Sequence, residues 1–309
     1  MATPRGIRYI PAIDGLRAVA VIAVMLYHLG FKWIPGGFLG VDLFFVISGY
    51  VITRLLLDSI QRSGGLDLRA FYIARVRRLL PPLVFMIITT TVVVGLWAPD
   101  TMRRFLGDTP FALFGGMNWW LVFRQTDYFE AIGRPPLLQH AWSLGVEAQF
   151  YLIWPLVLIT LYKLSRCNLK SVSGILIVLA VLSFSFNVWL TQKGNSEAAF
   201  FNTFGRIWEL LVGAIVAGFV DRITLPTAMA KFLRIAGISA LALSIYHYDG
   251  ATLFPGVAAL LPVLGTALIL GVSQDKSDIV DRSLSLAPMV FVGKISYSLY
   301  LWHWPALVL

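Results

Sequence analysis

The sequence predicts an all-α polytopic membrane protein with about nine to ten transmembrane helices, one of which is re-entrant. Of its 309 residues, 58% are hydrophobic and 13% are charged, whereas a soluble chain carries about 25% charged residues. The windows 79–99, 171–192 and 250–274 contain no charge, and each is long enough to cross a bilayer as a helix. Their apolar residues are continuous and do not alternate, which favours helices over barrel strands.

Apolar runs separated by polar loops define the expected spans, which are 10–30, 38–57, 79–98, 146–162, 172–191, 205–220, 234–248, 252–272 and 293–309. A further stretch, 109–123, is ambiguous. It contains Pro110 and Gly115, which weaken a helix, and the adjacent Trp119 and Trp120, which favour a membrane interface. We therefore treat a full crossing and a re-entrant or interfacial segment as alternatives.

The distribution of basic residues separates these alternatives. With the N-terminus in the cytoplasm, a full crossing of 109–123 places 12 Lys and Arg residues inside and 12 outside, with Arg17 in the membrane. If 109–123 instead returns to the outer side without crossing, 17 Lys and Arg residues lie inside and 7 lie outside. Because cytoplasmic loops are enriched in Lys and Arg, we predict that 99–145 is one excursion on the outer side. The predicted cytoplasmic loops are then 54–78, 163–171, 221–234 and 273–294.

Charge, cysteine content and the chain ends further limit the function classes and the domain organisation that the sequence allows. The net charge of +9 comes from basic residues between apolar runs, which is typical of membrane anchoring and does not indicate nucleic-acid binding. One cysteine, Cys167, excludes an intrachain disulfide. No cleavable signal peptide precedes the first span, which is expected to be an uncleaved anchor. We expect residues 1–309 to form one membrane domain without a soluble domain, cut off within its last helix.

The first span carries polar groups where they are costly. Arg17 and His28 are 11 positions apart, which places them on nearly the same helix face and roughly 16 Å apart along the axis. Asp14, one turn before Arg17, is its expected partner. The alternative is that Arg17 extends to the cytoplasmic surface and that His28 is a structural interfacial histidine.

Two further segments combine polar residues with apolar spans. Gly36, Gly37, Gly40 and Gly49 flank Asp42 in and before the second span, where they permit tight packing or close approach of a ligand. In the cytoplasmic loop, an arginine pair at i and i+3 shares one helical face. These are Arg75 and Arg78, which suit phosphate groups or simply anchor the chain.

The outer excursion ends in a polar helix start that contains Ser143 and Glu147. This pair resembles a loose capping box, but the neighbouring polar residues exceed what a cap requires. The remaining candidates for the site are His140, Trp142, Arg206, Glu209 and His303. Arg206 and Glu209 also fit a structural i,i+3 ion pair, and His247 is interpreted as structural. The sequence contains no phosphate-binding loop, nucleophile elbow or paired Cys/His metal spacing, so no metal is expected.

Five motifs in order give the chain a resemblance to the membrane acyltransferase 3 family. They are Arg17-x10-His28, the Phe-Phe-Val-Ile-Ser-Gly-Tyr stretch at 44–50, the Arg75/Arg78 pair before Leu-Pro, the Trp-Ser-Leu-x-x-Glu-x-Gln-Phe-Tyr segment at 142–151, and Ser-Tyr-x-x-Tyr-x-x-His at 296–303. The resemblance covers nearly the whole chain. It implies a bacterial O-acyltransferase of the cytoplasmic (inner) membrane.

The resemblance also implies substrates and roles. Acceptors in the family are hydroxyls of lipopolysaccharide O-antigen, peptidoglycan or exopolysaccharide, and in some members macrolides or other small products. In the family, the residues that correspond to Arg17 and His28 are associated with catalysis. Those that correspond to Arg75 and Arg78 are associated with an acyl-CoA donor, and those that correspond to Ser143 and Glu147 are associated with activity on the outer side. Asp14, Asp42, His140, Trp142, Arg206, Glu209 and His303 are expected to bind substrate. Many members carry an extracytoplasmic SGNH hydrolase-like domain after the last spans, and the sequence leaves open whether a longer parent of this chain carries one.

The resulting hypothesis is a transfer of an acyl group, expected to be acetyl, from cytoplasmic acyl-CoA to a cell-surface glycan. Arg17 would hold the thioester or its oxyanion, and His28 would act as general base or transient acyl carrier. No cofactor is expected to stay bound. The rival from a different class is a secondary transporter, which also buries charge near the midplane. Transporters often contain two related halves, and the sequence shows none.

Overall fold

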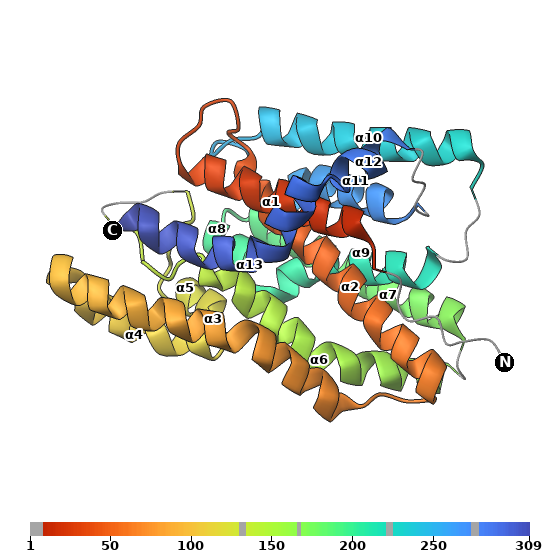
Figure 1. Cartoon of the computed structure of the whole chain (residues 1–309), viewed down its shortest axis with the longest axis horizontal. Coiled ribbons are helices and arrows are strands. Elements are labelled where there is room, and N and C mark those ends of the chain that lie inside the picture. The colour runs from red at the N-terminus through yellow and green to blue at the C-terminus, as the bar shows by residue number, and fades with distance from the viewer. Residues whose placement is uncertain (1–8, 130–133, 166–167, 221–224, 273–277) are drawn as a thin grey trace.

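The computed structural model describes residues 9–129, 134–165, 168–220, 225–272 and 278–309, which are helical with no strand (Figure 1). The α-helices are α1 (Pro11–His28), α2 (Gly40–Ser63), α3 (Leu68–Trp97), α4 (Met102–Leu113), α5 (Met117–Phe123), α6 (Ala141–Leu164), α7 (Leu169–Gln192), α8 (Ser196–Phe201), α9 (Thr203–Phe219), α10 (Thr227–His247), α11 (Leu260–Leu270), α12 (Ile279–Leu284) and α13 (Ala287–Val308). Short 3-10 turns are η1 (Gly37–Leu39), η2 (Pro99–Thr101) and η3 (Gly256–Ala259).

Seven of the described helical segments are long and apolar enough to cross a membrane: α1, η1 with α2, α3, α6, α7, α8 with α9, and α10. A shorter apolar segment, Gly256–Leu270, occupies the expected span 252–272. The last expected span lies in α13, which is 22 residues long but interrupts its apolar surface with Ser, Tyr and His side chains. These helices form a multi-pass membrane protein, as the composition predicted.

The ambiguous segment 109–123 does not form a membrane-spanning helix. It is divided between α4 and α5, and Gly115 between them has a φ of 70°, which a residue without a Cβ adopts at little cost. At 12 residues, α4 is roughly 18 Å long, too short for a hydrocarbon core of about 30 Å. Figure 1 shows that α3 ends and α6 begins on the same side of the bundle. The structure therefore agrees with an excursion that returns to one face.

Helix α3 begins earlier than the sequence suggested. The loop 54–78 was expected to end at Arg78, but α2 continues to Ser63 and α3 starts at Leu68. The side chain of Asp67 accepts a hydrogen bond from the backbone N–H of Ala70 at 2.9 Å, which caps the helix start. Arg75 and Arg78 consequently lie within helix α3 and not in the loop before it.

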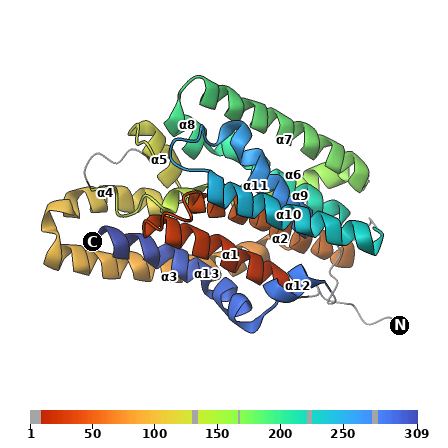
Figure 2. The ribbon, with the colours of Figure 1, turned by 90° about the horizontal axis from the view of Figure 1, so that it is seen from above.

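Close helix crossings hold the bundle together (Figure 2). Helices α2 and α9 cross at Gly49 and Gly213, where an added Cβ would overlap the carbonyl oxygens of Leu210 and Val46. Small residues at such crossings let backbones approach closely, which is a main source of helix association in lipid. Gly37 and Gly40 pack against α1 in the same way. The glycines around Asp42 are thus explained by packing.

Candidate active site

A narrow cavity of about 90 Å³ brings together five of the residues singled out in the sequence. Helix α1 contributes Arg17, α3 contributes Arg75 and Arg78, and α6 contributes Ser143 and Glu147. Helices α2 and α13 complete the wall with Phe44, Phe45, Ile47, Ser48, Val51, Ile52, Ser296, Tyr297 and Tyr300. Arginines and the Ser/Glu pair had been expected at opposite sides of the membrane. They face one space, because α3 carries its arginines inward and α6 descends from Ser143 to Glu147.

The cationic end of the cavity is only partly neutralised. Arg17 lies 3.7 Å from Asp14, as the sequence predicted. The guanidinium carbon of Arg75 lies 5.5 Å from the ring centroid of Phe71, within cation–π range. Its Nε atom and the hydroxyl of Ser296 are buried without a hydrogen-bond partner among the described residues. Buried polar atoms are nearly always paired, so both atoms point to water or a ligand in the cavity.

Glu147 sits in a hydrogen-bonded group that links α2 to α6. The Ser48 hydroxyl donates to Glu147 Oε1 at 2.7 Å, and the Tyr151 hydroxyl lies 3.0 Å from Ser48 Oγ and 3.3 Å from Glu147 Oε2. These contacts fix the carboxyl group on the cavity wall. Glu147 thus shares the cavity wall with the three arginines.

The outer end of the cavity leads to a second polar group. Ser143 Oγ and Tyr300 Oη lie 2.7 Å apart. One turn further along α13, His303 Nδ1 lies 2.6 Å from the carbonyl oxygen of Tyr300, and His303 Nε2 lies 3.0 Å from His28 Nδ1. Tyr300 therefore borders both the cavity and the histidine pair. His28 itself does not line the cavity with Arg17, although both residues belong to α1.

The hydrogen bonds define which imidazole nitrogens carry hydrogen. A carbonyl oxygen only accepts, so His303 Nδ1 must donate to Tyr300, and in the neutral ring His303 Nε2 accepts. His28 Nδ1 then donates to His303, which leaves His28 Nε2 as an acceptor. Tyr128 Oη lies 3.2 Å from that nitrogen and is the donor. The lone pair of His28 is thus directed at a hydroxyl group, the geometry that a general base requires.

His140 lies beside this pair but has no hydrogen bond through its ring. Its ring centroid is 5.7 Å from that of His303, the side chain is 3% exposed, and neither nitrogen has a partner among the described residues. Among those residues, no group of three His, Cys, Asp or Glu side chains is arranged to hold a metal ion.

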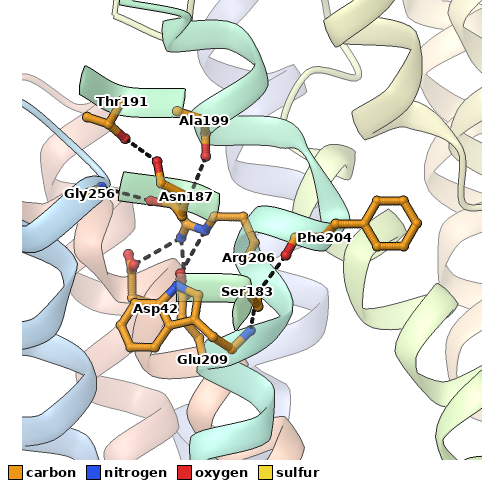
Figure 3. A network of polar contacts seen from close by, with 10 residues as sticks. Asp42, Ser183, Asn187, Thr191, Ala199, Phe204, Arg206, Glu209 and Gly256 are labelled. Atoms are coloured by element: carbon orange, nitrogen blue, oxygen red, sulfur yellow. Dashed lines mark hydrogen bonds and ion pairs between the residues drawn. The ribbon is translucent and has the colours of Figure 1, made fainter. Parts of the chain in front are cut away.

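Asp42, Arg206 and Glu209 form a separate buried ion cluster (Figure 3). Arg206 Nη2 lies 2.9 Å from Asp42 Oδ1, and Arg206 Nε lies 2.8 Å from Glu209 Oε1. The three side chains are at most 1% exposed, and the guanidinium carbon lies over four aromatic rings, those of Phe45, Trp142, Phe200 and Phe254. This geometry fits the alternative that Arg206 and Glu209 form a structural ion pair. Substrate binding by these residues and by Trp142 stays a prediction.

Replacing Arg206 with methionine is expected to lower the free energy of unfolding by roughly 3–5 kcal/mol, because two carboxyl groups would lose their buried counterion. The measurement is the thermal midpoint of the purified protein in detergent. Arg62→Met is the control, since Arg62 pairs with Asp58 on an exposed helix surface. A normal midpoint combined with weakened acceptor use would instead assign Arg206 to substrate binding.

Several residues of the site were not singled out from the sequence. They are Ser48, Tyr128, Tyr151, Tyr297 and Tyr300. Four are tyrosines, which are common at membrane interfaces and therefore carry little signal alone. The quoted motifs contain four of the five, Ser48, Tyr151, Tyr297 and Tyr300, so the hydroxyl groups within these motifs were the available signal.

Comparison with known proteins identifies the family of this chain. The model of the acyltransferase domain family matches residues 10–309, so this chain belongs to that family, as the five motifs indicated. The peptidoglycan O-acetyltransferase OatA of Listeria monocytogenes is 37% identical over 98% of this chain and 50% of its own length. The O-acetyltransferase OatA of Staphylococcus aureus is 35% identical over 97% of this chain and 51% of its own. The chain thus spans about half the length of these relatives. No solved structure matches it.

Proposed function

We propose that this protein transfers an acetyl group from acetyl-CoA, bound from the cytoplasm, to a hydroxyl of a cell-surface glycan. The observation that carries the proposal is the shared cavity, which places three arginines beside Ser143 and Glu147. The names of the relatives, peptidoglycan O-acetyltransferase and O-acetyltransferase, support the acyl group and the acceptor class. A transporter is not favoured, because the family is one of acyltransferases.

The donor side is proposed from charge. The cavity opens towards the end of the bundle where α2 ends and α3 begins, and the positive-inside distribution assigns that end to the cytoplasm. We place the chain in the bacterial cytoplasmic membrane with Arg75 and Arg78 facing the incoming donor. Guanidinium groups bind anionic oxygens through paired hydrogen bonds, and Arg17 lies where it can hold the thioester oxygen and the negative charge that develops on it.

The size of the cavity supports a short acyl chain. An acetyl group fits a cavity of about 90 Å³.

The acceptor side is proposed from the histidine pair. An acceptor hydroxyl that replaces the Tyr128 hydroxyl would donate its proton to His28 Nε2 as it attacks the acetyl carbonyl. The thiol of coenzyme A leaves with a proton, so the products are the acetate ester and free coenzyme A. Arg17 and His28 lie roughly 16 Å apart along α1, a separation that the Arg17 side chain, the acetyl thioester and the acceptor hydroxyl must span together. We therefore assign Arg17 to the donor end and His28 to the acceptor end of the path.

The decisive experiment measures both products. Purified protein in lipid nanodiscs, supplied with acetyl-CoA and glycan fragments, is expected to release free thiol only when acetate ester appears on the glycan. Thiol release is followed with a thiol reagent and the ester by mass spectrometry. Neither product forming, with peptidoglycan, O-antigen or exopolysaccharide fragments, would rule out the proposal.

The proposed orientation can be tested by cysteine labelling in intact cells. Gly133 and Cys167 would report on opposite sides but lie outside the described residues, so we choose Gln125 and Lys231, both exposed, in a Cys167→Ser background. An impermeant maleimide is expected to label Gln125→Cys directly and Lys231→Cys only after permeabilisation. The reverse pattern would invert the topology and remove the cytoplasmic donor route.

A further inference from the structure

His303 has both of its ring nitrogens engaged by other parts of the protein. Nδ1 donates to the carbonyl oxygen of Tyr300 at 2.6 Å, and Nε2 accepts from His28 Nδ1 at 3.0 Å. The side chain is 6% exposed, and its ring is stacked on that of His28 with the centroids 5.1 Å apart. The sequence led us to expect that His303 binds substrate, but neither nitrogen keeps a hydrogen or a lone pair for a substrate hydrogen bond.

Helix packing fixes the two histidines against each other. Helices α1 and α13 run side by side (Figure 2), and a Cβ added at Gly293 would overlap the carbonyl oxygen of Asp14. Further along the same contact, the Trp304 ring lies edge-on to the His28 ring with the centroids 4.7 Å apart. Trp304 Nε1 in turn donates to the carbonyl oxygen of Pro136 at 2.8 Å. The contact between the two imidazoles therefore depends on closely packed helices.

The order of the groups is that of a base and its orienting partner. The Tyr300 carbonyl is followed by the His303 ring and then by the His28 ring, whose Nε2 lies 3.2 Å from the Tyr128 hydroxyl. In a serine-hydrolase triad, a carboxylate holds the histidine in the tautomer whose other nitrogen accepts the hydroxyl proton. His303 stands where that carboxylate would stand. A neutral imidazole can orient its neighbour without placing another charge inside a membrane protein, where a charge is costly.

We infer that His303 is a positioning residue that acts through His28. This inference rests on the proposed function. His303 holds His28 with its hydrogen on Nδ1, so that the lone pair of Nε2 is available to the acceptor hydroxyl. When the acceptor proton moves to Nε2, His28 becomes an imidazolium and its hydrogen bond to His303 becomes charge-assisted, which makes it roughly twice as strong. Because this gain arises as the transfer proceeds, it favours the transition state over the ground state.

The inferred role excludes a proton relay through the histidine pair. The Tyr300 carbonyl oxygen accepts a hydrogen bond from His303 Nδ1 but is not a base, so the hydrogen stays on His303. The acceptor proton therefore remains on His28 Nε2 until the thiolate of coenzyme A takes it. His303 neither gains nor loses a proton and forms no bond to the acetyl group.

The first test reads the tautomer of His28 without any substrate. Nitrogen NMR of the protein in nanodiscs, with isotope-labelled histidine, is expected to show wild-type His28 with its hydrogen on Nδ1. His303→Leu removes the acceptor and should give a mixture of both tautomers. His247→Leu is the matched control, because His247 is exposed at the end of α10, and should leave the His28 signals unchanged. Hydrogen on Nε2 of wild-type His28 would overturn the inference.

The second test is kinetic. His303→Leu is expected to lower kcat for acetyl transfer to the glycan roughly 10–10²-fold, because one charge-assisted hydrogen bond is lost, with little change in KM for the glycan. His303→Gln keeps an acceptor oxygen and should recover part of the rate. The double variant with His28→Ala should be no slower than His28→Ala alone, since residues that act as a unit are not additive. A structural or substrate-binding residue would instead add its own loss, and that result would contradict the positioning role.

The two measurements also separate this inference from the proposed function. A slower transfer in His303→Leu with an unchanged His28 tautomer would refute the inference and leave the proposed function standing. The inferred tautomer in a wild-type protein that acetylates no glycan would refute the proposed function alone.

Discussion

Alanine in place of His28 is expected to lower acetyl transfer to the glycan by about 10²–10⁴-fold, the usual contribution of a positioned acid or base. The His28 imidazole is held between His303 and the Tyr128 hydroxyl at 3.0 and 3.2 Å, so its Nε2 lone pair is directed at a hydroxyl position. Alanine removes the base without introducing a charge or extra volume. Membrane insertion and the thermal midpoint should change little.

The control for this substitution is His247→Ala. His247 lies exposed at the C-terminal end of α10 and should tolerate alanine with full activity. Tyr128→Phe is a more conservative second variant at the same position of the site. It deletes one hydroxyl group and leaves the ring stacked on Phe200 at 4.1 Å. Glycan acetylation at the wild-type rate in His28→Ala would exclude His28 as a general base and as an acyl carrier, and the acceptor end would have to lie elsewhere.

The residues that face the site from within one helix were predictable from sequence. The spacing of Arg17 and His28 follows from 3.6 residues per turn, and the i,i+3 relation of Arg75 and Arg78 holds wherever the helix begins. Glu209 with Arg206 is a third case, an i,i+3 pair that the structure closes at 2.8 Å. Such relations depend only on local helix geometry.

Contacts between distant segments were not predictable in the same way. His28 meets Tyr128 across 100 residues, and Ser143 meets Tyr300 across 157. Tyr128 follows α5 in an irregular segment, where no periodicity indicates the direction of a side chain. The shared cavity of Ser143, Glu147 and the α3 arginines was also not predictable, because hydropathy locates the apolar part of α3 but not its polar first turns from Leu68 onward.

Substituting Arg17 is expected to give the second large effect, a loss of about 10²–10³ in kcat, as for removal of one oxyanion donor. Arg17 is 18% exposed in its side chain and lines the cavity. A group that stabilises the thioester carbonyl as charge develops acts in the transition state, so kcat should fall more than KM rises. Arg17→Lys keeps the charge but loses the planar fork and should recover only part of the rate.

Two donors separate this role from phosphate binding, since acetyl-CoA carries the nucleotide phosphates and S-acetylpantetheine lacks them. Because both contain the same thioester, Arg17→Gln should slow both by the same factor. Arg77→Gln is the matched control, since Arg77 is exposed on α3 between the two cavity arginines. A loss confined to acetyl-CoA would place Arg17 among the phosphate ligands, and the thioester would then need another oxyanion donor, for which Arg75 lies on the same wall.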